Sequence, residues 1–234
     1  MAVKSALVTG SSSGIGKAIT ALLLKNGIKV IGLARDHGKF TPNQSNYYPI
    51  TIDLSDIVSI EKKIPLILKE YPEISIFVGN AGYGDFRHLE NFSTPQIQRF
   101  LDLNLISQII LSRNLTSHFK SNGGGDIIFM GSEAGLAGKR KSTLYSAAKF
   151  GLRGFAQALR DETGTSGIRV CLINPGLVRS SFFDSLDFEP GVSENNAIAP
   201  DDIAKIVFEL LNTRNGTIID EINLSPVSNS INLK

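Results

Sequence analysis

Short apolar segments alternate with longer segments of helical periodicity along the chain. The first apolar run, Val3–Thr9, ends in a glycine turn, and the apolar residues after it recur at helical spacing as far as Asn26-Gly27, a good helix stop. The same patterns recur further along. They predict strands at Lys29–Leu33, Tyr48–Asp53, Ile74–Val78, Asp126–Met130, Ile168–Ile173 and Thr217–Ile219, and helices at Asp56–Glu70, Thr94–His118, Thr143–Thr163 and from Pro200 onward.

This alternation predicts an α/β fold, because each connection between neighbouring parallel strands needs a covering helix. The strands are apolar throughout, as expected when both faces of a sheet are buried. We therefore expect a single Rossmann-type domain over residues 1–234, with a doubly wound parallel sheet of about seven strands and helices on both faces. Pro65 lies inside the helix predicted at Asp56–Glu70 and should kink or shorten it.

Composition and charge exclude several classes of protein. Hydrophobic residues make up 42% and charged residues 20% of the chain, so a packed core is expected. A net charge of +2 gives no reason to expect nucleic acid or a membrane as a partner. Cys171 is the only cysteine, which excludes an intrachain disulfide and fits a reducing compartment. Since neither a signal peptide nor a spanning helix is recognisable, we expect a cytoplasmic protein.

A glycine-rich loop, Thr9–Gly16, joins the first strand to the first helix. Its glycines permit a tight turn and the close approach of a pyrophosphate, which the helix N-terminus would bind. A P-loop is excluded, because Ser11 stands at its first glycine position and Ala18 at its Ser or Thr. The spacing is Gly-x-x-x-Gly-x-Gly, so the Gly-x-Gly-x-x-Gly fingerprint is absent as well. The loop predicts a dinucleotide site.

This spacing resembles the cofactor loop of the short-chain dehydrogenase/reductase family, and further family motifs follow in order. They are Asp53-Leu54, Asn80-Ala81-Gly82, Asn104, Ser132, Tyr145 and Lys149 in Tyr-x-x-x-Lys, and Asn174-Pro175-Gly176. Ser180 departs from the family's usual threonine but keeps the hydroxyl. The resemblance implies cofactor contacts from Gly10, Ser11, Ser12, Ser13, Gly14, Ile15, Gly16, Asp53, Leu54, Asn80, Ala81, Gly82, Tyr145, Lys149, Pro175, Gly176, Val178 and Ser180.

Three of these residues form a candidate catalytic set. Tyr145 and Lys149 are four residues apart and share one face of a helix. A neighbouring ammonium should lower the pKa of the phenol, which makes Tyr145 the candidate acid for carbonyl reduction and base for alcohol oxidation. Ser132 can stabilise the charge that develops on the substrate oxygen. The resemblance implies that Lys149 also holds the nicotinamide ribose and that Asn104 joins it in a water-linked proton relay.

Other chemistry has less support in the sequence. Ser132 does not lie in the Gly-x-Ser-x-Gly elbow of a serine hydrolase, because Met130 stands where the first glycine would be. The histidines His37, His88 and His118 are scattered along the chain, and no cluster has the spacing of metal ligands. We therefore expect no metal site.

The end of the second strand decides between the two nicotinamide cofactors. An acidic residue there binds the ribose 2′-hydroxyl, whereas a guanidinium pairs with a 2′-phosphate. The chain has Arg35 at this place, followed by Asp36. We expect NADP(H) rather than NAD(H), although Asp36 favours the second.

Family geometry implies substrate walls at Tyr83–His88, Glu133–Lys141 and Leu177–Ala199, the last a substrate-binding loop at about 177–199. Its phenylalanines suit an aliphatic or aromatic ketone, and Lys139-Arg140-Lys141 would suit an acidic substrate or an acyl-carrier partner. The resemblance implies hydride transfer between nicotinamide and a small carbonyl or alcohol, either a 3-oxoacyl compound or a general ketone or aldehyde. A dinucleotide-sensing protein and a nucleotide-sugar epimerase or dehydratase on the same fold are the alternatives.

The helices predicted at Thr94–His118 and Thr143–Thr163 correspond to helices that commonly pair across a two-fold axis in family members. Apolar stripes on or beside both helices favour such pairing: Leu111, Leu115 and Phe119 on the first, and Leu152 and Phe155 on the second. We expect a homotetramer or at least a homodimer.

Overall fold

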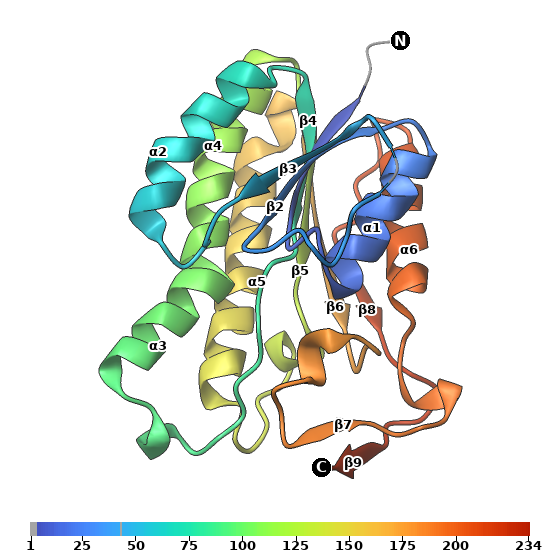
Figure 1. Ribbon diagram of the computed structural model, residues 1–234. Helices are drawn as coiled ribbons and strands as arrows, with labels where there is room; N and C mark the ends of the chain where they lie inside the picture. Colours follow the sequence, from blue (N-terminus) through green and yellow to red (C-terminus); the bar gives the residue numbers. More distant parts are fainter. Residues whose placement is uncertain (1–3, 43) are drawn as a thin grey trace.

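The computed structural model describes residues 4–42 and 44–234. Within them, seven strands form one parallel sheet in the order β3-β2-β1-β4-β5-β6-β8 (Figure 1). Val3, where the sequence predicts the first strand to begin, lies outside the described residues. The strands are β1 (Ser5–Thr9), β2 (Lys29–Ala34), β3 (Tyr47–Thr51), β4 (Ile74–Gly79), β5 (Gly125–Met130), β6 (Ile168–Pro175) and β8 (Glu221–Leu224).

Helices cover both faces of this sheet (Figure 1). One face carries α1 (Gly14–Lys25) and α6 (Pro200–Asn212), and the other carries α2 (Ile57–Glu70), α4 (Ser107–Ser121) and α5 (Thr143–Thr163). An apolar cluster lies on each side of the sheet, and every residue of β1 is buried, as expected for a strand packed on both faces. The predicted doubly wound α/β sheet is confirmed.

The sheet topology determines where a ligand would bind. Strand order runs outward in one direction from β1 through β2 and β3, and in the other from β4 through β8. In open sheets of this kind, the crevice at the carboxyl ends of the strands beside such a reversal is the usual binding place. The carboxyl ends of β1 and β4 meet here, where Thr9 Oγ1 accepts hydrogen bonds from the backbone N–H groups of Asn80 and Ala81 at 2.8 and 2.9 Å.

The single helix predicted at Thr94–His118 is interrupted. The helix α3 (Thr94–Leu101) passes through a π-helical turn, Asp102–Ile106, before α4 begins. In that turn the Ser107 N–H bonds to the Asp102 carbonyl, five residues back. A side chain bonds to a backbone carbonyl close to this turn, because Asn104 Nδ2 donates a hydrogen bond to the Phe100 carbonyl oxygen at 3.0 Å. A π turn inserts one extra residue and is frequent at functional sites, which helical periodicity alone does not reveal.

Two further expectations about elements differ from the structure in part. The shortening of α2 expected from Pro65 does not occur, because Ile60, Ile64 and Ile67 anchor the buried side of the helix while Pro65 lies on its exposed side. The strand predicted at Thr217–Ile219 forms instead at β8. There it pairs with the end of β6, and the Glu221 carboxylate accepts a hydrogen bond from Asn174 Nδ2 at 2.7 Å. A polar side chain is tolerated at this edge of the sheet, so a prediction based on apolar residues placed the strand too early in the chain.

The prediction that these apolar stripes form a subunit interface is also wrong. Leu111, Leu115 and Phe119 are fully buried against their own sheet, as is Leu152, and Phe155 packs partly buried against the same cluster. These side chains belong to the core and support no association. A short antiparallel pair that the sequence did not predict, β7 (Phe188–Pro190) with β9 (Ile231–Leu233), lies below the main sheet in Figure 1.

Candidate active site

A cleft of about 1170 Å³ opens at the carboxyl ends of the central strands. It brings together residues that are far apart in the sequence, and every candidate site residue except Ser11 and Gly16 lines it. Both exceptions lie in the glycine loop and are buried. The motifs that the sequence singled out therefore converge on one place.

The glycine loop has the geometry of an anion cradle. Gly10 and Gly14 have φ angles of +66° and +50°, which side chains with a Cβ rarely adopt. A Cβ at Gly16 would collide with the Gly10 carbonyl oxygen, so this glycine is required for the start of α1 to pack against the loop. Ser13 caps α1 without a side-chain bond to the backbone, which leaves N–H groups of the first turn available to an anion.

Ser11 has a structural partner instead of a place in the cleft. Its Oγ lies 3.1 Å from Tyr47 Oη, which lies 2.9 Å from His37 Nδ1, and His37 Nε2 lies 3.1 Å from the Ile50 carbonyl oxygen. This hydrogen-bonded chain connects the glycine loop with the segment after β2. No local sequence signal points to it, because Ser11 and Tyr47 meet only through the sheet.

The segment after β2 holds two cations at the cleft, Arg35 and Lys39. The sequence reasoning singled out the first and missed the second. The carboxylate of Asp36 turns back on its own loop, where Oδ1 accepts a hydrogen bond from the Gly38 N–H at 2.7 Å. Asp36 Oδ1 is thus already engaged, and the two cations line the cleft beside it.

Asp53 lines the same end of the cleft and carries a charge. Its Oδ1 accepts hydrogen bonds from the Ser55 N–H and hydroxyl at 2.9 and 2.7 Å, and its Oδ2 pairs with Arg99 at 2.8 Å. Burial alone would raise the pKa of Asp53, but the bonds from Ser55 and the charge of Arg99 together lower it. Asp53 is therefore ionised at neutral pH.

Ser132 and Tyr145 lie together at the other end of the cleft. Ser132 begins a short 3-10 turn, Glu133–Gly135, and its Oγ accepts a hydrogen bond from the Ala134 N–H at 3.2 Å. Burial raises the pKa of Tyr145 to about 12, while a hydrogen bond with the Ser132 side chain opposes this and the Glu133 charge adds to it. The expectation of a lowered phenol pKa is wrong, because burial outweighs the hydrogen bond with Ser132.

Lys149 lies beneath the phenol but is not bonded to it. Its Nζ is 5.7 Å from the centre of the Tyr145 ring and donates a hydrogen bond to the Met130 carbonyl at 2.9 Å. Burial lowers the pKa of Lys149 to about 8. Asn104 is buried, and its Oδ1 accepts from the Tyr83 N–H at 3.2 Å. Its side chain is thus held by two backbone groups, the Phe100 carbonyl and the Tyr83 N–H.

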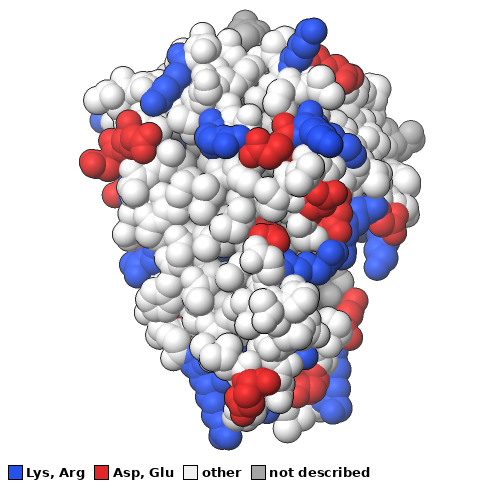
Figure 2. All heavy atoms as spheres, turned by 90° about the vertical axis from the view of Figure 1, so that its left-hand side faces the viewer, with Lys and Arg blue, Asp and Glu red and all other residues white. Residues whose placement is uncertain are grey.

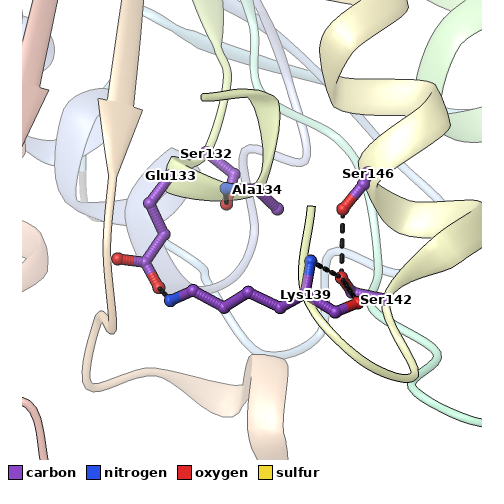
Figure 3. Close-up of polar contacts among 6 residues, drawn as sticks. All are labelled: Ser132, Glu133, Ala134, Lys139, Ser142 and Ser146. Carbon is purple, nitrogen blue, oxygen red and sulfur yellow. Dashed lines mark hydrogen bonds and ion pairs between the residues drawn. The ribbon is translucent and has the colours of Figure 1, made fainter. Parts of the chain in front are cut away.

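A polar cluster stabilises the loop between the turn at Ser132 and the start of α5 (Figure 3). Lys139 Nζ reaches back to Glu133 Oε1 at 3.0 Å, so part of the basic triplet is neutralised within the site. Ser142 Oγ donates to the Lys139 carbonyl at 2.7 Å, accepts from the Lys139 N–H at 3.1 Å and lies 3.0 Å from Ser146 Oγ. The cluster ties the turn after Ser132 to the start of α5.

The loop after β6 closes over the glycine loop. Ser180 caps a short 3-10 turn, its Oγ accepting a hydrogen bond from the Phe182 N–H at 3.4 Å. A Cβ at Gly14 would come within 3.3 Å of Ser180 Cβ, so the two loops are in contact. Serine thus fits the position where threonine is usual.

The sequence predicts neither a metal site nor a membrane-spanning helix. In residues 4–42 and 44–234, no group of three or more His, Cys, Asp or Glu side chains is placed to hold a metal ion. Across the same part of the chain, no helix has the length and apolar character needed to cross a membrane.

Comparison with known proteins adds independent evidence. The chain matches the family model of short chain dehydrogenases over residues 4–189. It is 33% identical over 188 residues to the 3-oxoacyl-acyl-carrier-protein reductase of Buchnera aphidicola subsp. Acyrthosiphon pisum, covering 79% of this chain and 77% of that protein. The reductase of the same name from Buchnera aphidicola subsp. Baizongia pistaciae is 30% identical over 238 residues, covering 98% and 91%.

Solved structures agree with this fold. A metagenomic short-chain oxidoreductase in complex with NADP is 27% identical, with a TM-score of 0.82 and coverage of 96% of this chain and 97% of that one. An alcohol dehydrogenase from Thermococcus sibiricus, complexed with 5-hydroxy-NADP, is 24% identical with a TM-score of 0.84 and the same coverage. The second likeness concerns the fold alone.

Proposed function

The chain belongs to the short-chain dehydrogenase family of oxidoreductases, and from this premise we propose that it transfers hydride between NADP(H) and a carbonyl or alcohol substrate. The observation that carries the proposal is the convergence of Ser132, Tyr145 and Lys149 with the glycine loop in one cleft. The NADP complex of the metagenomic relative supports the choice of cofactor.

The residues present fit a dinucleotide phosphate. The glycine loop leaves backbone N–H groups free at the start of α1, and Arg35 with Lys39 supplies positive charge at the adenosine end. Ser180 and the Asn80–Gly82 turn would enclose the other end. When bound, the reduced cofactor supplies the hydride that the carbonyl carbon accepts.

The chain's own residues would handle the oxygen and its proton. The carbonyl oxygen accepts hydrogen bonds from Ser132 Oγ and Tyr145 Oη, and it takes the phenolic proton as the C=O bond becomes C–OH. A high phenol pKa keeps Tyr145 protonated and ready to donate at neutral pH. Lys149 holds its ammonium beneath the ring, where it stabilises the phenolate left behind.

Replacing Tyr145 tests this assignment. Tyr145→Phe should reduce turnover by ~10²–10⁴, the usual contribution of a positioned acid, while NADPH binding stays nearly unchanged. Ser132→Ala should act mainly on turnover, and the losses of the double variant should not add, because both residues act on one oxygen. The measurement is NADPH oxidation with a panel of ketones, aldehydes and 3-oxoacyl thioesters.

Two outcomes would contradict the proposal. Full activity in Tyr145→Phe would mean that water or another side chain supplies the proton. NADPH binding with no turnover across the panel would instead support a dinucleotide sensor on the same fold.

A further inference from the structure

Aromatic side chains from two separate loops cover the candidate catalytic phenol. Phe86 follows β4, whereas Phe182 and Phe188 follow β6, and we call these three residues the aromatic cover. The ring centres of Phe86 and Phe182 lie 5.2 and 6.0 Å from that of Tyr145, and 6.5 Å from each other. Phe188 lies 5.4 Å from Phe86. All three rings line the cleft, and Tyr145 is only 8% exposed.

The backbone has room for these rings because of one glycine. A Cβ at Gly84 would lie 2.5 Å from Phe182 Cζ and 2.5 Å from Phe86 Cε2. Any side chain at this position would push the two rings away from each other. The aromatic cover is therefore a packed arrangement with its own supporting position, and its rings pack against the phenol that a substrate carbonyl must reach.

The contacts of the cover indicate what can enter. Ring centres at 5.2–6.5 Å lie in the range of edge-to-face aromatic pairs, which stabilise beyond the area they bury. A substrate that parts Phe86 from Phe182 removes such a contact. A planar aromatic group restores edge-to-face contacts with both rings, whereas a saturated group of the same size restores only the buried area.

Charges of both signs line the cleft, including Arg140 and Lys141. The charge that acts on the Tyr145 phenol, however, is the Glu133 carboxylate, which adds to its raised pKa. Lys139, on the adjacent loop, is already paired with Glu133 (Figure 3). An uncharged group therefore suits the space between the rings, since a charge moved into it would lose its hydration.

We propose that the aromatic cover makes this enzyme selective for uncharged aryl ketones and aryl aldehydes, whose ring takes a place between Phe86 and Phe182. This inference rests on the proposed carbonyl reduction and names its substrate class. It assigns Phe86 and Phe182 as specificity-determining residues, and Gly84 as the position that allows them to meet.

A matched pair of ketones tests it. Acetophenone and cyclohexyl methyl ketone differ in aromaticity but little in size, and we expect kcat/KM with NADPH to be about tenfold higher for the first, equivalent to about 1.4 kcal/mol. Phe86→Leu and Phe182→Leu should each reduce this ratio to about threefold or less. Phe208→Leu, a partly buried ring on α6 outside the cleft, is the control and should leave the ratio unchanged.

A binding measurement separates specificity from chemistry. Without cofactor, acetophenone should raise the melting temperature of the wild-type chain more than an equal concentration of cyclohexyl methyl ketone, and this difference should vanish in Phe182→Leu. Equal kcat/KM values for the two ketones, or a preference that persists in both leucine variants, would overturn the inference. Faster turnover of acetoacetyl-coenzyme A than of acetophenone would overturn it too, but would leave carbonyl reduction standing. An absence of turnover with every carbonyl would defeat the proposed function and the inference with it.

Discussion

At the scale of one residue, Lys149 illustrates a conflict between the stability of the fold and the proposed function of the site. The residue is 5% exposed, and the hydrogen bond from its ammonium to the Met130 carbonyl does not offset burial, which lowers the lysine pKa to about 8. Burying a charge without an opposite charge is costly, and such groups concentrate where chemistry requires them. The buried ammonium is thus a cost in stability that the fold tolerates, in keeping with the role proposed for Lys149.

Replacing this lysine should therefore stabilise the protein. Lys149→Met should raise the free energy of unfolding at pH 7 by roughly 1–3 kcal/mol, from the pKa shift less one lost hydrogen bond. Because the pKa is lower in the folded state, the wild type carries the full cost below about pH 8 and recovers it as pH rises from about 8 toward 10.5. The advantage of the variant should shrink over that window in urea titrations.

The exposed Lys25→Met serves as the matched control, and its effect on stability should be near zero at every pH. A Lys149→Met chain that is less stable than the wild type at pH 7 would contradict this account of the buried charge. Comparing the variant with the wild type at each pH cancels the titration of Cys171, which both chains share.

The cofactor preference also belongs to single residues. We expect NADP(H) to bind at least about tenfold tighter than NAD(H), or about 1.4 kcal/mol. Arg35→Asp should narrow or reverse this ratio, and Lys39→Ala should reduce it by a smaller factor, because both cations line the cleft where we propose that the 2′-phosphate binds. Fluorescence titration with both cofactors measures the ratio. Equal affinities in the wild type would refute the assignment of Arg35.

The sequence could predict the residues of the site but not their electrostatics. Motif spacing named Ser132, Tyr145 and Lys149, which lie in the cleft as expected. The direction of the phenol pKa was wrong because burial is a property of the packed cover, which brings Phe86 and Phe182 over Tyr145 from distant segments. Lys39 was missed for the same reason, since only the fold shows which surface cations face the cleft.

At the scale of elements, hydrophobic periodicity predicted the bounds of a helix best where one face of the helix is buried along its whole length. The bounds of α5 match the prediction, because one face of that helix is buried along its whole length. The helix before it was predicted as continuous, since the side-chain bonds of Asn104 and Ser107 to backbone carbonyls leave no mark on hydrophobic spacing. The strand β9 escaped prediction because it has one short partner and its residues are exposed.

The pairing of β7 with β9 should hold the substrate-side loop in place. Ile231 and Leu233 line the cleft, and the Lys234 N–H donates to the Asp187 carbonyl at 2.9 Å. Deleting residues 230–234 should increase hydrogen exchange at 188–190 and proteolytic cleavage within 181–199. The melting temperature should change little, because β9 lies outside the main sheet. Asn232→Ala, an exposed side chain in β9, is the control.

At the scale of the whole molecule, the sheet unites both ends of the described chain. β1 near one end and β8 near the other belong to the same seven-stranded sheet of residues 4–42 and 44–234, which supports our proposal of one domain. The side that faces left in Figure 1 shows broad areas without charged side chains, between groups of charged residues (Figure 2). Exposed residues on the helices therefore give the reason to expect association. They replace the predicted stripes, which are buried.

Phe150 is the residue on which that expectation can be tested. It lies on α5 and is 44% exposed, although large apolar side chains on such a helix are usually covered. We expect a homodimer or homotetramer at micromolar concentration by sedimentation velocity, and Phe150→Glu should shift it toward the monomer, because pairing across a two-fold axis would bring two carboxylates together. Val192→Glu, an 88% exposed position in the loop between β7 and α6, should leave the mass unchanged. A wild-type chain that sediments as a monomer would refute the association. An oligomer that withstands Phe150→Glu would place the interface on another face, and α5, which carries the candidate residues Tyr145 and Lys149, would then be free of subunit contacts at Phe150.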